Sequence, residues 1–123
     1  VRALIVDDSR AMRIMLSRFM GELGFECAEA GHGKDALGKL GEGPMPDVIL
    51  CDWNMPEMNG LELVKAVRAD GRYADVKIVM ATTETEASQV NDAMAAGANE
   101  YLMKPFTKES LQGKLGILGL VAA

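Results

Sequence analysis

The chain has 123 residues, of which 49% are apolar and 25% charged, and its formal net charge is −5. This composition excludes disordered, collagen-like and coiled-coil proteins, and the length predicts a single domain over residues 1–123. An acidic chain without an apolar run of roughly 20 residues is not expected to bind nucleic acid or to cross a membrane.

Short apolar runs alternate along the chain with segments of helical periodicity. Most of the runs are rich in Val, Ile or Leu, and they are bounded by Gly, Pro, Asp or Thr, which favours strands. The first, third and fourth runs are apolar at successive positions, as in parallel strands covered on both faces. The five predicted strands are Ala3–Val6, Phe25–Ala30, Asp47–Cys51, Val76–Ala81 and Glu100–Met103.

The segments between the strands predict five helices. Strands that alternate with helices form parallel units, whose right-handed crossovers place helices on both faces of an open sheet. Cys27 and Cys51 lie within apolar runs, which predicts buried, reduced thiols in a cytoplasmic protein. The helices are expected from a cap at Ser9 to Gly24, near Lys34–Leu40, from Gly60, over Glu86–Ala96 with Gly97 as the stop, and after a cap at Thr107.

Reactive side chains follow four of the predicted strands. The carboxyl ends of parallel strands meet at one edge of a sheet, so these side chains are expected to share one crevice. Two buried carboxylates about 4 Å apart repel by about 4 kcal/mol at an effective dielectric of about 20, which requires positive charge nearby. The residues are Asp7 and Asp8, Asp52, Thr82 and Thr83, and Lys104 before Pro105.

This set of oxygen ligands favours a hard divalent cation, and Mg²⁺ in particular. Zinc is disfavoured because the only histidine, His32, lies elsewhere in the sequence. A carboxylate beside Mg²⁺, an ammonium and a hydroxyl is suited to phosphoryl transfer, with the carboxylate as the nucleophile.

The stretch Cys51-Asp-Trp-Asn-Met-Pro-Glu-Met-Asn-Gly60, with Asp7-Asp8-Ser9 and Lys104-Pro105-Phe106, resembles the receiver domains of response regulators in bacterial two-component signalling. The resemblance covers the whole chain and is strongest to single-domain chemotaxis regulators. It implies a flavodoxin-like α/β fold with the strand order 2-1-3-4-5.

The same resemblance assigns roles to individual residues. Asp52 is expected to be the phosphoacceptor. Asp8 and Asp52 are expected to bind Mg²⁺ directly, together with the backbone carbonyl of Asn54, and Asp7 through a water molecule. Lys104 is expected to pair with the phosphoryl group.

Other positions carry the family's switching and turnover roles. Thr82 matches the hydroxyl that closes on the phosphoryl group, and Tyr101 matches the aromatic residue that moves with it. Asn54 and Glu84 occupy positions that influence hydrolysis of the acyl phosphate, and the peptide bond before Pro105 is expected to be cis. Trp53 is expected to be half exposed beside the phosphoacceptor.

The resemblance also implies partners. A sensor histidine kinase would donate the phosphoryl group, and a surface over about residues 86–120 would signal to the flagellar motor switch or another effector. The chain is expected to be a cytoplasmic monomer without turnover of a free substrate, either stand-alone or excised from a larger regulator.

Two other function classes remain open at this point. A phosphatase with an aspartyl-phosphate intermediate would carry an Asp-x-Asp pair after the first strand, whereas Asp7 and Asp8 are adjacent. A flavodoxin-like cofactor binder would need a hydroxyl- and glycine-rich phosphate loop there, and the two aspartates would repel the phosphate of FMN.

Overall fold

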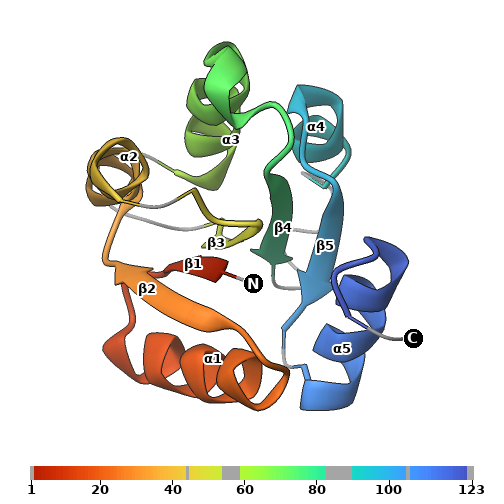
Figure 1. The fold of residues 1–123 in the computed structure, drawn as a ribbon. Helices are drawn as coiled ribbons and strands as arrows, with labels where there is room; N and C mark the ends of the chain where they lie inside the picture. Colours follow the sequence, from red (N-terminus) through yellow and green to blue (C-terminus); the bar gives the residue numbers. More distant parts are fainter. Residues whose placement is uncertain (1, 44, 54–58, 83–89, 105, 122–123) are drawn as a thin grey trace.

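In the computed structural model, which describes residues 2–43, 45–53, 59–82, 90–104 and 106–121, five parallel strands form one sheet. The strand order is β2-β1-β3-β4-β5, which confirms the order expected from the resemblance (Figure 1). Each predicted strand boundary lies within one residue of the observed one. The strands are β1 (Arg2–Val6), β2 (Glu26–Ala30), β3 (Val48–Asp52), β4 (Lys77–Thr82) and β5 (Glu100–Met103).

The predicted helices are present, and the two for which a cap was predicted begin at that cap. Ser9 Oγ accepts a hydrogen bond from the Met12 N–H at 3.2 Å, and Thr107 Oγ1 accepts one from the Ser110 N–H at 3.1 Å. A 3₁₀ turn, η1 (Gly71–Tyr73), was not predicted. Residues 86–89 of the fourth predicted helix lie outside the described residues. The helices are α1 (Arg10–Glu22), α2 (Gly33–Glu42), α3 (Gly60–Ala69), α4 (Val90–Ala96) and α5 (Lys108–Ile117).

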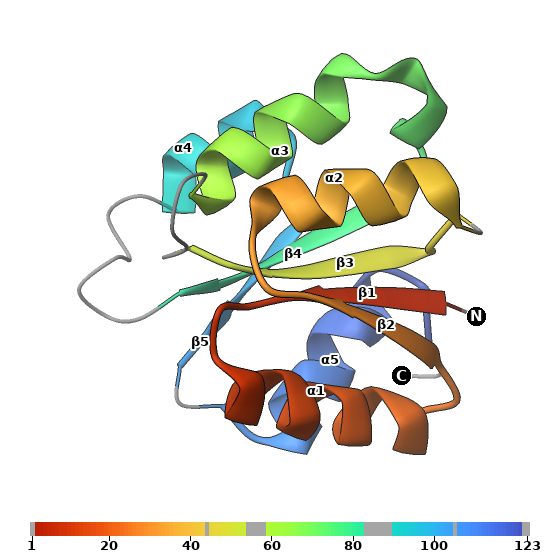
Figure 2. The ribbon, with the colours of Figure 1, turned by 90° about the vertical axis from the view of Figure 1, so that its left-hand side faces the viewer.

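The helices cover both faces of the sheet. Figure 2 shows α1 and α5 on one face and α2, α3 and α4 on the other. Each face has its own apolar cluster: Ile5 and Leu50 contribute to the first, and Leu4 and Ile49 to the second. Neighbouring residues of one strand thus point to opposite clusters, which explains the continuous apolar runs of β1, β3 and β4.

The edge strand β2 corrects one expectation. Its first three residues are exposed, and Cys27 is therefore an exposed free thiol rather than a buried one, whereas Cys51 in β3 is buried as predicted. Glu26 and Glu29 interrupt the apolar residues of this run, which is typical of a strand with a face in solvent.

Arg68, near the end of α3, ties that helix to the turn between α4 and β5. Its guanidinium donates to the carbonyl oxygens of Gly97 at 2.9 Å and Val76 at 2.6 Å, and to Asn99 Oδ1 at 2.8 Å. It also reaches the carbonyl oxygens of Tyr73 and Ala74 beside η1. Gly97 has φ +122°, and a Cβ there would lie 2.6 Å from Arg68 Cγ, so the arginine crosses directly over this glycine.

No helix in the described ranges has both the length and the apolar character required to span a bilayer.

Candidate functional site

Three carboxylates lie together at the carboxyl ends of β1 and β3. The two strands are paired with Val6 opposite Cys51, which brings Asp7 and Asp8, just after β1, beside Asp52 at the end of β3. One oxygen from each carboxylate lies within 4.8 Å of the others. Asp7 and Asp52 are buried, and Asp8 is exposed. The structure therefore brings together the acidic residues that the sequence indicated.

Lys104, directly after β5, supplies positive charge to this acidic cluster. Its Nζ donates a hydrogen bond to Asp52 Oδ1 at 2.8 Å and lies 3.8 Å from Asp7 Oδ2. Its main-chain N–H donates to the Thr82 carbonyl oxygen at 2.7 Å, which fixes the lysine beside the end of β4.

One ammonium does not fully compensate the acidic cluster. Burial raises the pKa of Asp7, against the opposing effects of the Ser9 N–H and Lys104. Burial also raises the pKa of Asp52, although its hydrogen bond with Lys104 acts in the opposite direction. Asp7 Oδ2 is buried and accepts no hydrogen bond from the described residues, because the 3.8 Å separation from Lys104 Nζ is too long for one.

The donor set fits a hard cation such as Mg²⁺. It offers carboxylate oxygens only, one of which is a buried acceptor without a hydrogen-bond partner, and Asp8 is exposed enough to leave room for water ligands. Cys51 is buried and burial strongly raises the pKa of its thiol, so it does not compete as a thiolate ligand.

Thr82 lies on β4, the strand that pairs with the strand of Asp52, and Tyr101 lies on β5, on the far side of β4. Asp52 pairs with Ala81 of β4, and the next residue of β4, Thr82, is fully buried. Thr82 Oγ1 donates a weak hydrogen bond to Met103 Sδ at 3.9 Å. Tyr101 is half-buried and packs against the apolar cluster on the α3 and α4 side. The expected roles of Asn54, Glu84 and Pro105 fall outside the described residues.

Trp53 is buried, with 6% of its surface exposed, which corrects the expectation of a half-exposed indole. Its main chain is held on both sides: the N–H donates to the Ala81 carbonyl oxygen at 3.1 Å, and its carbonyl oxygen accepts from the Gly60 N–H at 2.8 Å. Gly60 is required by this packing. A Cβ at that position would lie 2.9 Å from the Asp52 carbonyl oxygen and 3.0 Å from Trp53 Cα.

Arg13 is a supporting residue that the sequence did not reveal. From α1 its Nη1 donates to the Asp7 carbonyl oxygen at 2.7 Å, and its Nε pairs with Glu29 at 3.2 Å. The only signal available was its position one helical turn after the Ser9 cap, facing back toward Asp7.

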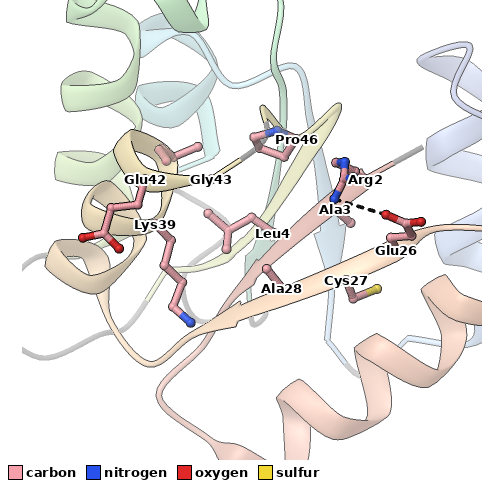
Figure 3. Close-up of a pocket in the computed structure, with 11 residues that line it drawn as sticks. Arg2, Ala3, Leu4, Glu26, Cys27, Ala28, Lys39, Glu42, Gly43 and Pro46 are labelled. Carbon is pink, nitrogen blue, oxygen red and sulfur yellow. Dashed lines mark ion pairs between the residues drawn. The ribbon is translucent and has the colours of Figure 1, made fainter.

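A hollow of about 290 Å³ opens at the opposite end of β1 and β2, beside the last turn of α2 (Figure 3). Leu4, Ala28 and Leu40 line it, and the Arg2–Glu26 ion pair lies at its side. It contains none of the acidic cluster, so this hollow is separate from the reactive site.

The chain resembles known proteins over nearly its whole length. The family described as "Response regulator receiver domain" matches residues 3–116. "Chemotaxis protein CheY1" of Helicobacter pylori is 45% identical over 119 residues, which cover 96% of each chain. "Chemotaxis protein CheY homolog" of Campylobacter jejuni is 46% identical over 116 residues, which cover 94% of this chain and 89% of the other. The solved structure of chemotaxis response regulator CheY4 of Vibrio cholerae matches with a TM-score of 0.88 at 40% identity, over 96% of this chain and 98% of the other.

Proposed function

The chain belongs to the response regulator receiver domain family, and on that premise we propose that it is a phosphoaccepting signalling switch of the chemotaxis type. The single observation that carries the proposal is Asp52. This carboxylate is buried at the end of β3, accepts a hydrogen bond from Lys104, and lies within 4.8 Å of two other carboxylates.

Asp52 is the nucleophile of the proposed reaction. One of its carboxylate oxygens attacks the phosphorus of a phosphohistidine on a sensor histidine kinase, the P–N bond breaks, and the imidazole leaves with the electron pair. Lys104, within hydrogen-bond distance of Asp52, is placed to stabilise negative charge on the transferred group. Asp8, Asp52 and the carbonyl of Asn54 would hold Mg²⁺ directly, with Asp7 acting through water. The ion would neutralise charge on the phosphoryl oxygens.

The phosphorylated state is proposed to act through β4, β5 and the helices beside them. The Thr82 hydroxyl leaves Met103 for the phosphoryl group, Tyr101 moves with it, and the surface over about residues 86–120 changes its affinity for a downstream protein such as the flagellar motor switch. Water then hydrolyses the acyl phosphate, at a rate influenced by Asn54 and Glu84. The chain thus works as a cytoplasmic monomeric switch and not as a turnover enzyme on a free substrate.

The alternative hypothesis within the family is that this receiver belongs to a larger regulator with a different output. A phosphatase with an aspartyl-phosphate intermediate is disfavoured because Asp7 and Asp8 are adjacent, and only Asp7 is buried.

Incubation with acetyl phosphate and Mg²⁺ tests the proposal by intact-mass analysis. The wild type is expected to gain one hydroxylamine-sensitive group of about 80 Da, located at Asp52 by peptide mapping. Asp52→Asn should gain none, and Asp92→Asn, which replaces an exposed carboxylate on α4, should behave like the wild type. An unmodified wild type, or a label retained by Asp52→Asn, would overturn the assignment.

A further inference from the structure

Lys114 of α5 reaches toward β5, which lies beside this helix in Figure 1. Its Nζ forms an ion pair with Glu100 Oε1 at 3.2 Å and lies 4.3 Å from the centroid of the Tyr101 ring. Both side chains of the ion pair are largely shielded from solvent, with 27% of the lysine and 15% of the glutamate side chain exposed. The ammonium therefore contacts the face of an aromatic ring in a partly desolvated setting, where a cation–π contact is effective.

Glu100 fixes the position of this ammonium. The same Oε1 atom accepts a hydrogen bond from the Tyr101 main-chain N–H at 3.0 Å, so the carboxylate is anchored to the strand that carries the ring. Lys114 is held in turn by the carboxylate and by the ring. Residues Glu100, Tyr101 and Lys114 form a closed set of contacts, which we call the Lys114 clamp.

The clamp acts on one side of the Tyr101 ring, and the apolar cluster beneath α3 and α4 contacts the side chain as well. A ring that moves away from this position loses the contact with the ammonium. A contact that is made in only one of the two ring positions shifts the equilibrium between them by the whole free energy of that contact.

We propose that Lys114 is a positioning residue that holds Tyr101 in its unphosphorylated orientation and so sets how readily the switch responds. The inference rests on the proposed function, because it takes Tyr101 as the residue that moves. A cation–π contact at a partly exposed site corresponds to a factor of about two to five in that equilibrium. By linkage, removal of the ammonium should make the phosphorylated conformation easier to reach by the same factor.

The sequence offers a direct spectroscopic test, because Tyr73 and Tyr101 are its only tyrosines. In protein with labelled tyrosine rings, Lys114→Met should shift the NMR signals of the Tyr101 ring and leave those of the Tyr73 ring in place. Titration with beryllium fluoride and Mg²⁺, as a stable mimic of the phosphoryl group, should reach half-saturation at about two- to fivefold lower concentration than in the wild type.

Two further variants separate positioning from simple packing. Lys114→Arg keeps a cation within reach of the ring and the carboxylate, and should restore the wild-type midpoint. Lys108→Met removes another lysine of α5, whose ion pair is with Glu22 at 3.0 Å, and should leave both the ring signals and the midpoint unchanged.

The outcomes distinguish the two proposals. A wild type that does not respond to beryllium fluoride overturns the proposed function and the clamp with it. A wild type that responds while Lys114→Met has the same midpoint, or while Lys108→Met shifts the midpoint equally, overturns the clamp alone.

Discussion

Replacement of Asp7 by asparagine removes one of the three clustered carboxylates and keeps the shape of the side chain. At 4.8 Å, the largest separation in the cluster, the repulsion between two carboxylates is about 3.5 kcal/mol at an effective dielectric of about 20. Asp7 experiences two such repulsions, and solvent weakens the one from exposed Asp8. The attraction to Lys104 Nζ at 3.8 Å is about 4 kcal/mol on the same scale. The repulsions and the cost of burying the charge together exceed this attraction.

We therefore expect Asp7→Asn to raise the free energy of unfolding of the metal-free protein by about 1–3 kcal/mol. The asparagine Oδ1 can still accept the hydrogen bond that the Ser9 N–H donates to Asp7 at 2.9 Å, so the turn before α1 is retained. For a chain of this length the melting temperature should rise by roughly 3–10 °C.

Thermal and urea denaturation in the presence of a chelator measure this effect. Asp75→Asn, which changes an exposed carboxylate just before β4, at the amino end of the sheet, is the control and should stay within about 0.5 kcal/mol of the wild type. Addition of Mg²⁺ should narrow the difference: the wild type gains about 2.7 kcal/mol at a hundredfold excess over its Kd, and the variant gains less at the same concentration. A variant that is less stable than the wild type in chelator would show that the charge of Asp7 stabilises the fold, and the reasoning would be wrong.

Three further predictions concern pH, close packing and the arginine at the end of α3. Burial raises the pKa of folded Asp7 above its ordinary value of 3.8, so the folded state binds the proton more tightly than the unfolded state does. The metal-free wild type should therefore lose stability relative to Asp7→Asn as pH rises through that raised pKa. A difference between their urea midpoints that stays constant from about pH 3 to pH 7 would contradict this. Gly60→Ala should lower the free energy of unfolding by about 1–3 kcal/mol, measured by urea denaturation, because the added methyl meets main-chain atoms. Gly38→Ala, which adds a methyl in open space on α2, should be neutral or stabilising, and equal effects of the two substitutions would refute the packing argument. Arg68→Lys should cost about 2–4 kcal/mol because most of its partly buried carbonyl acceptors lose their donor, and amide exchange should accelerate in the turn between α4 and β5. Unchanged exchange in that turn would contradict this prediction.

The local pattern of the chain was sufficient to predict its elements. Short apolar runs marked the strands to within one residue, and Ser9 and Thr107 marked the starts of two helices, because the preference for a strand or a cap depends on neighbours in sequence. The strand order needed the family resemblance. The exposure of the strand around Cys27 did have a signal, because Glu26 and Glu29 interrupt its apolar residues, whereas the first, third and fourth runs are apolar at successive positions.

The acidic cluster was predictable for a related reason, since strand ends converge in any parallel sheet. The contacts around it were not. Arg13 and Lys114 act through partners 6 and 14 residues away, on a carbonyl oxygen and on a carboxylate, and no spacing rule indicates such pairs. The burial of Trp53 and the close approach of Gly60 to its main chain likewise appear only in three dimensions.

The arginine bridge at the end of α3 has a consequence for chimeric receivers. Four of its five acceptors are main-chain oxygens, so the side chains at 74 and 76 can be exchanged without loss of those bonds. Arg68, Gly97 and Asn99 are different: the glycine leaves space for the arginine, and the amide oxygen also accepts from the Ile78 N–H at 2.9 Å. A transplant of the α4–β5 segment between homologues should therefore succeed only when these three residues are transferred as a set.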